Sequence, residues 1–409
     1  MPVYRRTTLK LYPSASQAAE LDRVSELHRA LYNAALEERV DAWRKNRMHI
    51  SRSAQCKSLT LVRREHPEYA ALNAQSLQVT LWRLDRTFDA FFRRVKSGQT
   101  PGFPRFKSRD RFPGFGMNPQ TGWKFAPGNN WRHGRLTLSG IGTMRARGEV
   151  RTPGRIVTVD LMRKSNGWFL SLVVECEPHR ERTGDAVAGL DWGVETLATL
   201  CHGPMRFAEM QNDRLLSQEQ DAIKEAQRAL SKALRGKRSK RAARARRLLA
   251  KRSRRLANRR KDRNHQTTAA LVRDHAVIIT EDLSVKNMTA SAKGTAERPG
   301  KNVAQKAGLN RAILDASPGA WLSMARYKAE EAGTRLILVD PRKHRPSQTD
   351  PVSDEVRKKP LGQRKHTLPD GTVITRDQAA AWVLWNIGQT IIGREPTAAE
   401  TPETPARAA

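Results

Sequence analysis

The sequence contains little cysteine, no long apolar run and few acidic residues relative to basic ones. Its 409 residues include three widely separated cysteines, Cys56, Cys176 and Cys201, which form neither a disulfide framework nor a four-thiolate zinc site. No stretch approaches the roughly 20 apolar residues of a membrane span. The N-terminus carries arginines but lacks the apolar segment of a secretion signal. These absences predict a protein of a reducing cytoplasm without a membrane partner, and a composition rich in Ala and Arg indicates a bacterial genome of high GC content.

Basic residues dominate the charge balance. Lys and Arg total 75 against 41 for Asp and Glu, so the net charge is 75 − 41 = +34. A hydrophobic content of 38% with 28% charged residues is typical of a folded chain. A compact protein of this charge repels itself, which favours a polyanionic partner and a location close to the nucleoid.

Helical periodicity occurs twice in the first hundred residues. One apolar face follows Pro13-Ser14 and contains Leu21, Val24, Leu27, Leu31 and Ala35. A second apolar face contains Leu77, Leu81, Leu84, Phe88, Phe91 and Val95. Arginines on its other sides indicate either a solvated surface or a nucleic-acid groove. The aromatic residues Trp82, Phe88, Phe91 and Phe92 are expected in the core rather than as base-stacking platforms.

Glycine and proline end this helical pattern near residue 98. Short β-like runs follow at 135–139, 155–163 and 168–175, and a turn at 165–167 joins the last two. We therefore expect a small β-barrel or sheet over 98–182, a type of structure that also commonly binds nucleic acid.

The remaining chain alternates apolar strands with helical segments. Strands are predicted at 187–190, 195–200, 276–280 and 335–339, and single helices at 310–332 and 379–392. Between 221 and 263 there are 19 Lys and Arg against 3 Asp and Glu, a net of +16. The leucines within that segment favour a helical hairpin bent near Gly236, although a disordered basic arm is the alternative.

Three carboxylates occupy comparable positions in this region. Asp191 and Glu281 each follow a short apolar strand, and Asp377 begins the last helix. A carboxylate at one strand end usually only terminates the strand, but three in a strongly basic protein favour phosphodiester chemistry. Oxygen ligands without histidine or cysteine suit Mg²⁺ or Mn²⁺, and paired ions can activate water and stabilise the phosphate. We expect Asp191 to bridge two ions, each also held by Glu281 or Asp377.

The motifs around these carboxylates resemble the three split motifs of a RuvC nuclease. They are Gly189–Val194, Ile278–Leu283 with Lys286-Asn287-Met288, and Arg376-Asp377. The version is similar to the TnpB family of transposon-encoded RNA-guided nucleases and to the compact type V CRISPR effectors. Further similar stretches are Tyr32-Asn33, Leu84–Phe88, Phe91–Arg94, Gly102–Lys107, Asn258–His265, Gly308–Asp315, Tyr327-Lys328-Ala329 and Val339-Asp340-Pro341.

This resemblance implies an α+β multidomain protein that carries a guide RNA and cleaves complementary double-stranded DNA beside a short flanking motif. Base pairing would read the target sequence. The implied divisions are a first wedge strand at 1–12, a helical recognition domain at 13–97, a wedge β-barrel at 98–182, an RNase H-like (RuvC) domain at 183–340 with a basic hairpin at 215–265, an insert at 341–375, a RuvC C-terminal helix at 376–393 and a disordered tail at 394–409.

The insert departs from the family pattern. The family usually has a zinc ribbon there, with two Cys-x-x-Cys pairs. In this chain Asp350 and Ser353 replace the first pair, and Thr367 and Asp370 replace the second. A four-thiolate site cannot be built from these residues, so we predict no zinc. Ala379 also stands where the family has asparagine, which makes weakened cleavage conceivable.

Several choices stay open at this level. A guided protein that binds DNA without efficient cleavage is the main alternative, and a structural RNA-binding protein is a weaker one. The sequence does not choose between a CRISPR role in antiviral defence and a transposable element, or between a monomer and a dimer per guide RNA. The expected nucleic-acid contacts are Arg93, Arg94, Arg105, Lys107, Arg244, Arg247, Arg255, Arg259 and Arg376.

Overall fold

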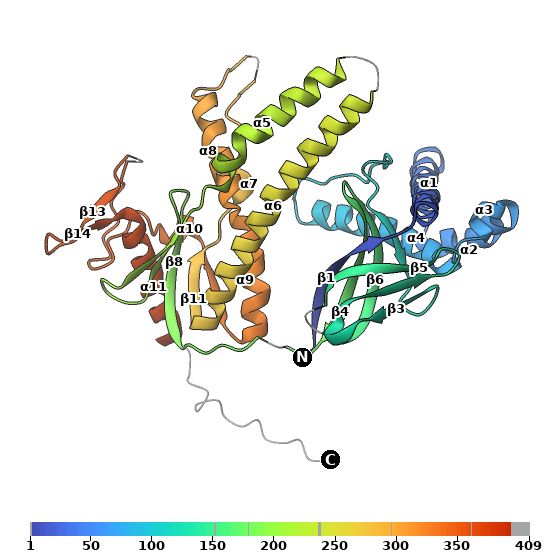
Figure 1. Ribbon diagram of the computed structural model, residues 1–409. Coiled ribbons are helices and arrows are strands. Elements are labelled where there is room, and N and C mark those ends of the chain that lie inside the picture. Colours follow the sequence, from blue (N-terminus) through green and yellow to red (C-terminus); the bar gives the residue numbers. More distant parts are fainter. Residues whose placement is uncertain are drawn as a thin grey trace. The chain divides into compact units, whose positions relative to one another are not determined.

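The computed structural model describes residues 2–150, 153–178, 180–235, 239–295, 297–360 and 362–393. The chain divides into an N-terminal unit, Met1–Pro178, and a C-terminal unit, His179–Ala409. Each unit is described by itself (Figure 1). The expected bend near Gly236 and the expected disordered tail at 394–409 lie outside the described residues.

Four helices occur among the described residues of the N-terminal unit. Their bounds are α1 Ala15–Asn46, α2 Arg52–Glu65, α3 Pro67–Ala70 and α4 Ala74–Lys96. Helix α1 begins with a capping box, in which Ser14 and Gln17 exchange side-chain to backbone hydrogen bonds. Both helices predicted from periodicity are confirmed, whereas α2 and α3 were not predicted.

The predicted aromatic core of α4 is only partly present. Phe88 packs against the core, but Trp82 is 42% exposed and Phe92 is 51% exposed. The expectation that both lie in the core is therefore wrong. The fully buried residues of α4 end at Leu84.

A curled antiparallel sheet completes the N-terminal unit. Within the described residues its strand order is β2-β6-β7-β1-β5-β4-β3, and β2 and β3 form its open edges. The bounds are β1 Val3–Tyr12, β2 Gly114–Met117, β3 Trp123–Pro127, β4 Arg132–Leu138, β5 Gly142–Glu149, β6 Arg155–Lys164 and β7 Gly167–Cys176. A short 3₁₀ helix, Asn129–Trp131, precedes β4. Of the expected barrel or sheet, the described strands form an open sheet, in which β1 pairs with β5 and β7.

His28 lies fully buried at the junction of α1, α4 and this sheet. Its ring stacks on Phe115 with centroids 5.0 Å apart. Nδ1 lies 2.7 Å from the Thr80 hydroxyl and Nε2 3.4 Å from the Ser76 hydroxyl. Burial, with a smaller effect from the charge of Arg83, lowers the pKa of His28 to about 3. The imidazole is therefore neutral in the folded protein.

The C-terminal unit contains a mixed sheet with the order β10-β9-β8-β11-β12 in its described residues. The bounds are β8 Ala186–Trp192, β9 Thr196–Cys201, β10 Phe207–Gln211, β11 His275–Glu281 and β12 Arg335–Val339. Strands β8, β11 and β12 are parallel, whereas β9 and β10 are antiparallel to their neighbours. All four predicted strands are present, and β10 was not predicted.

Helices cover both faces of this sheet (Figure 1). One face packs against α6 and α9, where Leu190 and Ile278 of the strands join Leu271, Trp321 and Ala325 in one core. The other face packs against α11. The helices are α5 Leu215–Leu234, α6 Lys240–Asp274, α7 Val285–Met288, α8 Val303–Ala316, α9 Pro318–Ala332, α10 Pro341–His344 and α11 Arg376–Gly393.

The expectation of one helix over 310–332 is wrong. The chain forms two helices there, α8 and α9, and Ser317 between them has a left-handed φ of 55°. Pro318 explains the break, because its ring disfavours helical backbone at the residue before it and it has no N–H to donate.

The insert contains α10 and a two-stranded hairpin, β13 Lys365–Thr367 and β14 Val373–Thr375. Among the helices that the structure describes, none is both long and apolar enough to cross a membrane.

Candidate active site

Asp191 and Glu281 lie side by side because of the register of two parallel strands. Leu190 of β8 pairs with Thr280 of β11, so the next residue on each strand is the carboxylate. Side chains alternate along a strand, and the residues two positions earlier, Gly189 and Ile279, both contact α11. Both carboxylates therefore point to the face that α11 covers.

Helix α11 brings Asp377 to the same face. The helix begins with a capping box, in which Thr375 and Gln378 exchange side-chain to backbone hydrogen bonds. Asp377 lies in the first turn, where the helix dipole favours a carboxylate. Gly189 permits this close packing, because a Cβ there would lie 2.1 Å from the carbonyl oxygen of Ala381.

Burial and mutual repulsion make ionisation of these carboxylates unfavourable. Burial first, and then the charges of Glu281 and Asp377, hold the pKa of Asp191 well above its usual range. Burial also raises the pKa of Glu281 and that of Asp377. The charges of Arg364 and Arg376 lower the pKa of Asp377 and partly offset this effect.

The structure brings the predicted triad together around Asp191 but not into a closed metal cage. Across the described ranges, no group of three or more His, Cys, Asp or Glu side chains lies close enough to hold a metal ion. The donor chemistry still suits a hard divalent cation, because the site contains repelling carboxylate oxygens whose charge such an ion would offset. Side-chain movement would be needed to close the site around an ion.

A cavity of about 670 Å³ opens beside Asp377. Its walls are the β8–β9 turn, the start of α5, helix α8 and Arg364 of the insert. Three arginines from separate elements line it, namely Arg214, Arg311 and Arg364. None of the three was predicted as a site residue. Glu281 lines a smaller hollow beside Trp192.

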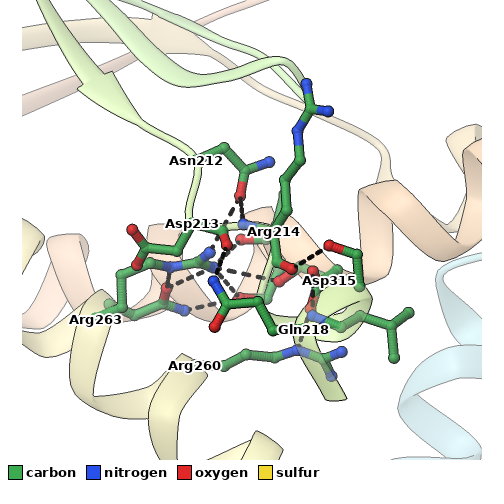
Figure 2. A network of polar contacts seen from close by, with 12 residues as sticks. Asn212, Asp213, Arg214, Gln218, Arg260, Arg263 and Asp315 are labelled. Atoms are coloured by element: carbon green, nitrogen blue, oxygen red, sulfur yellow. Dashed lines mark hydrogen bonds and ion pairs between the residues drawn. The ribbon is translucent and has the colours of Figure 1, made fainter. Parts of the chain in front are cut away.

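A polar network fixes the wall of this cavity (Figure 2). Asp315 accepts hydrogen bonds from the Arg260 side chain at 2.7 Å and from the backbone N–H of Leu216 at 2.8 Å. Arg263 is buried and donates to the carbonyl oxygens of Asp315 and Ala316.

The network continues to the β8–β9 turn. The amide of Asn212 donates to the carbonyl oxygen of Val194 at 2.6 Å, and its Oδ1 accepts from the backbone N–H of Arg214. Figure 2 shows the Arg214 side chain extending away from this network. The stretches 258–265 and 308–315, noted from their family resemblance, therefore contribute residues that position the cavity wall.

The structure gives two of the predicted nucleic-acid contacts on α6 an intramolecular partner. Arg255 and Arg259 lie within 3.3 and 3.7 Å of Glu219, which is buried on α5. Arg244 and Arg247, in the first turns of α6, are exposed. Arg376 donates to the carbonyl oxygen of Pro360 at 3.2 Å.

The predicted contacts of the N-terminal unit lie close in sequence to a partly exposed aromatic cluster. Arg93, Arg94 and Arg105 are exposed, and Lys107 is half-buried. Asn33 brackets the backbone of Lys107, because it accepts from the N–H and donates to the carbonyl oxygen. The aromatic cluster consists of Phe88, Phe91, Phe92 and Phe103, whose rings have centroids 5.2 to 6.4 Å apart.

Comparison with known proteins assigns a family. A family described as "Probable transposase" (OrfB_IS605) matches residues 171–292, and one described as "Helix-turn-helix domain" matches 1–48. In the structure this second segment is strand β1 followed by the single helix α1.

Two curated proteins are similar over long stretches. The Streptomyces pristinaespiralis protein "Putative RNA-guided DNA endonuclease" is 30% identical over 390 residues, covering 93% of this chain and 88% of that protein. The Escherichia coli (strain K12) protein "Putative RNA-guided DNA endonuclease InsQ" is 34% identical over 272 residues, or 66% of this chain, and the match spans 63% of its length. The chain therefore belongs to the TnpB (OrfB) family, which confirms the resemblance found in its motifs.

Solved structures support the fold. A Cas12f1 chain in a complex with guide RNA and target DNA matches with a TM-score of 0.60 at 12% identity, covering 94% of this chain and 99% of that one. The CRISPR-Cas_phi3 endonuclease matches with a TM-score of 0.54 at 10% identity, covering 97% and 93%.

Proposed function

We propose that the protein is an RNA-guided DNA endonuclease. The observation that supports this proposal is the position of Asp191 and Glu281 at the adjacent ends of two parallel strands, with Asp377 in the first turn of the helix that packs on them, in a chain of net charge +34. The names of its relatives and the complex of its structural neighbour agree with a guide RNA and target DNA as partners.

In this function the three carboxylates and the polar network of the cavity wall have different roles. Asp191, Glu281 and Asp377 supply the oxygens that would hold divalent ions, Mg²⁺ or Mn²⁺. Such ions, when bound, activate water and offset the charge of the phosphate. The polar network of Asn212, Asp315 and Arg263 keeps the wall of the cavity fixed beside Asp377.

In this proposal the parts of the chain have separate roles. The helices of 13–97 form the recognition segment, and the curled sheet, from 1–12 and 98–182, forms the wedge. The mixed sheet with α11 forms the RuvC domain, and 341–375 is an insert derived from a zinc ribbon. The exposed arginines of α4 and α6 contact phosphates of the guide or target.

The experiment that tests the proposal is cleavage by the purified guided complex in Mg²⁺. Asp191→Ala should abolish cleavage, while affinity for RNA and matched DNA stays within about twofold, because the carboxylate acts in chemistry rather than in binding. Asp185→Ala is the matched control, because Asp185 is 88% exposed just before the same strand. Sequencing of the co-purified RNA identifies the guide. Equal cleavage by Asp191→Ala and wild type would refute the assignment.

A second function is guided binding without efficient cleavage. Two observations favour it, namely Ala379 at the position where the family has asparagine, and the loss of the four cysteines from the insert. The same assay separates the two functions, because a binding protein would retain matched DNA uncut in Mg²⁺.

A further inference from the structure

The insert is organised around one buried pair, Asp350 and His366, which we call the clasp. His366 Nε2 donates to Asp350 Oδ2 at 2.8 Å, and the two residues are only 6% and 8% exposed. A buried charge is retained only when it is paired and hydrogen-bonded. The clasp therefore joins the two halves of the insert, since Asp350 lies in the first half and His366 on β13.

Asp350 also closes the turn in which it lies. Its Oδ1 accepts from the backbone N–H groups of Val352 and Ser353, both at 2.9 Å. Burial would raise the pKa of Asp350, but these two donors and His366 outweigh it and hold the pKa below the usual range. An ionised Asp350 thus fixes the turn at the position where the family has its first cysteine pair.

Three further hydrogen bonds fasten the insert to α11. The backbone N–H of Arg376 donates to the carbonyl oxygen of Arg364 at 2.9 Å, and its guanidinium donates to that of Pro360. Asn386 donates to the carbonyl oxygen of Pro351 at 2.7 Å. The insert is thus tied to the helix that carries Asp377.

Within the insert, Arg364 is the residue that lines the cavity beside Asp377. It lies two residues before His366 and lines the 670 Å³ cavity together with Asp377. Its charge lowers the pKa of that carboxylate, which places the two groups within electrostatic range. A guanidinium presents a planar fork of donors that matches a phosphate.

On the basis of the proposed function, we propose that Arg364 is a positioning residue that orients a DNA phosphate beside Asp377, and that the Asp350–His366 clasp holds it there. In this chain a carboxylate–imidazole hydrogen bond thus holds together an insert that lacks the four thiolates of a zinc ribbon.

The kinetic test compares Arg364→Ala, Arg364→Lys and the control Arg357→Ala in the guided complex. Arg357 is in the same insert but pairs with the exposed Glu355 and lies outside the cavity. We expect Arg364→Ala to lower kcat at least about tenfold, with KM within about twofold. Lysine should restore part of the loss, and Arg357→Ala should match wild type. An Arg364→Ala enzyme as fast as Arg357→Ala would overturn the role.

The clasp is tested with His366→Ala. We expect faster hydrogen exchange in 348–367 with unchanged exchange in α6, and a kcat as low as that of Arg364→Ala. The double variant His366→Ala/Arg364→Ala should be no slower than either single variant, because both substitutions act through the Arg364 side chain. A zinc chelator should leave wild-type exchange unchanged. Unaltered exchange in His366→Ala would overturn the clasp.

The outcomes separate this inference from the proposed function. Cleavage that Asp191→Ala abolishes but Arg364→Ala leaves unchanged would refute the inference alone. If the wild-type protein does not cleave, hydrogen exchange tests the inference instead. Bound target DNA should then slow the exchange of the backbone amides of residues 362–366 in the wild type and in Arg357→Ala. It should not slow that exchange in Arg364→Ala. Absence of that protection in wild type would refute the inference as well.

Discussion

Single buried polar residues in this protein have their protonation state fixed by their surroundings. His28 is the clearest case in the N-terminal unit, because stacking on Phe115 and two hydroxyl contacts fill its environment without an acidic partner. Asp191 is the corresponding case in the C-terminal unit, since burial and neighbouring carboxylates oppose its negative charge.

His28 predicts acid sensitivity of the N-terminal unit. Its folded pKa of about 3 lies below the value of 6.5 for a free imidazole, so the unfolded chain binds an extra proton between these pH values. The stability contributed by His28 is complete above pH 6.5 and falls as pH falls, by about 1.4 kcal/mol per unit.

His28→Gln, which does not titrate, should remove this part of the pH dependence. Urea unfolding at pH 4.5, 5.5 and 6.5, followed in α1 peptides by pulsed hydrogen exchange, measures it. Parallel pH profiles for wild type and variant would contradict the prediction.

At the scale of elements, the packing of α11 on β8 decides whether the carboxylates meet. Gly189 on β8 and Gly388 on α11 lie where this helix closely approaches the sheet. An added Cβ would lie 2.1 Å from the carbonyl oxygen of Ala381 at Gly189, and 2.2 Å from Cδ1 of Ile279 on β11 at Gly388. The first contact is with backbone, which cannot move aside without shifting the helix.

Gly189→Ala should therefore displace α11 and lower the free energy of unfolding of the C-terminal unit by about 1–3 kcal/mol or more. Gly362→Ala is the control, since a Cβ there meets nothing within 4 Å and should change stability by less than about 0.5 kcal/mol. Denaturant unfolding and hydrogen exchange in α11 provide the measurements. Equal stability of the two variants would contradict the prediction, because it would show that α11 can shift at no cost in free energy.

The elements that carry the carboxylates were predictable because their strands are short, continuous apolar runs that end in an acid. Strands β2, β3, β5, β10, β13 and β14 were missed. The α8–α9 break was missed although Ser317-Pro318 signals it. The clasp could not be predicted, because Asp350 and His366 share no periodic element and meet only through the turn and hairpin that surround them.

The same limit applied to the cavity wall. Asn212, Asp315 and Arg364 come from a loop, a helix and the insert, and no spacing in the sequence connects them. Family resemblance marked the stretch that contains Asp315 but gave that residue no role.

At the scale of the whole molecule, the excess of positive charge governs association. Arg244 and Arg247 on α6 are exposed, and exposed arginines that bind phosphates release counterions when they do so. Affinity for nucleic acid should therefore decrease steeply as salt rises.

Removing both charges, with Arg244→Gln and Arg247→Gln, should reduce the slope of log affinity against log salt by about 1.4 to 1.8, at 0.7 to 0.9 per phosphate. Arg23→Gln is the control, because Arg23 already pairs with Glu20 in the N-terminal unit. Fluorescence anisotropy with the guide RNA, between 50 and 400 mM salt, measures the slope. An unchanged slope in the double variant would show that Arg244 and Arg247 do not contact phosphates of the RNA.

The order of the carboxylates along the chain has a consequence for synthesis. Asp191 and Glu281 become neighbours when β8 pairs with β11, but Asp377 arrives only with the last described helix. A polypeptide still emerging from the ribosome thus lacks one third of its acidic triad. If the triad acts as proposed, cleavage would become possible only after α11 has been synthesised and has packed on β8, and a product terminated before Asp377 would lack it.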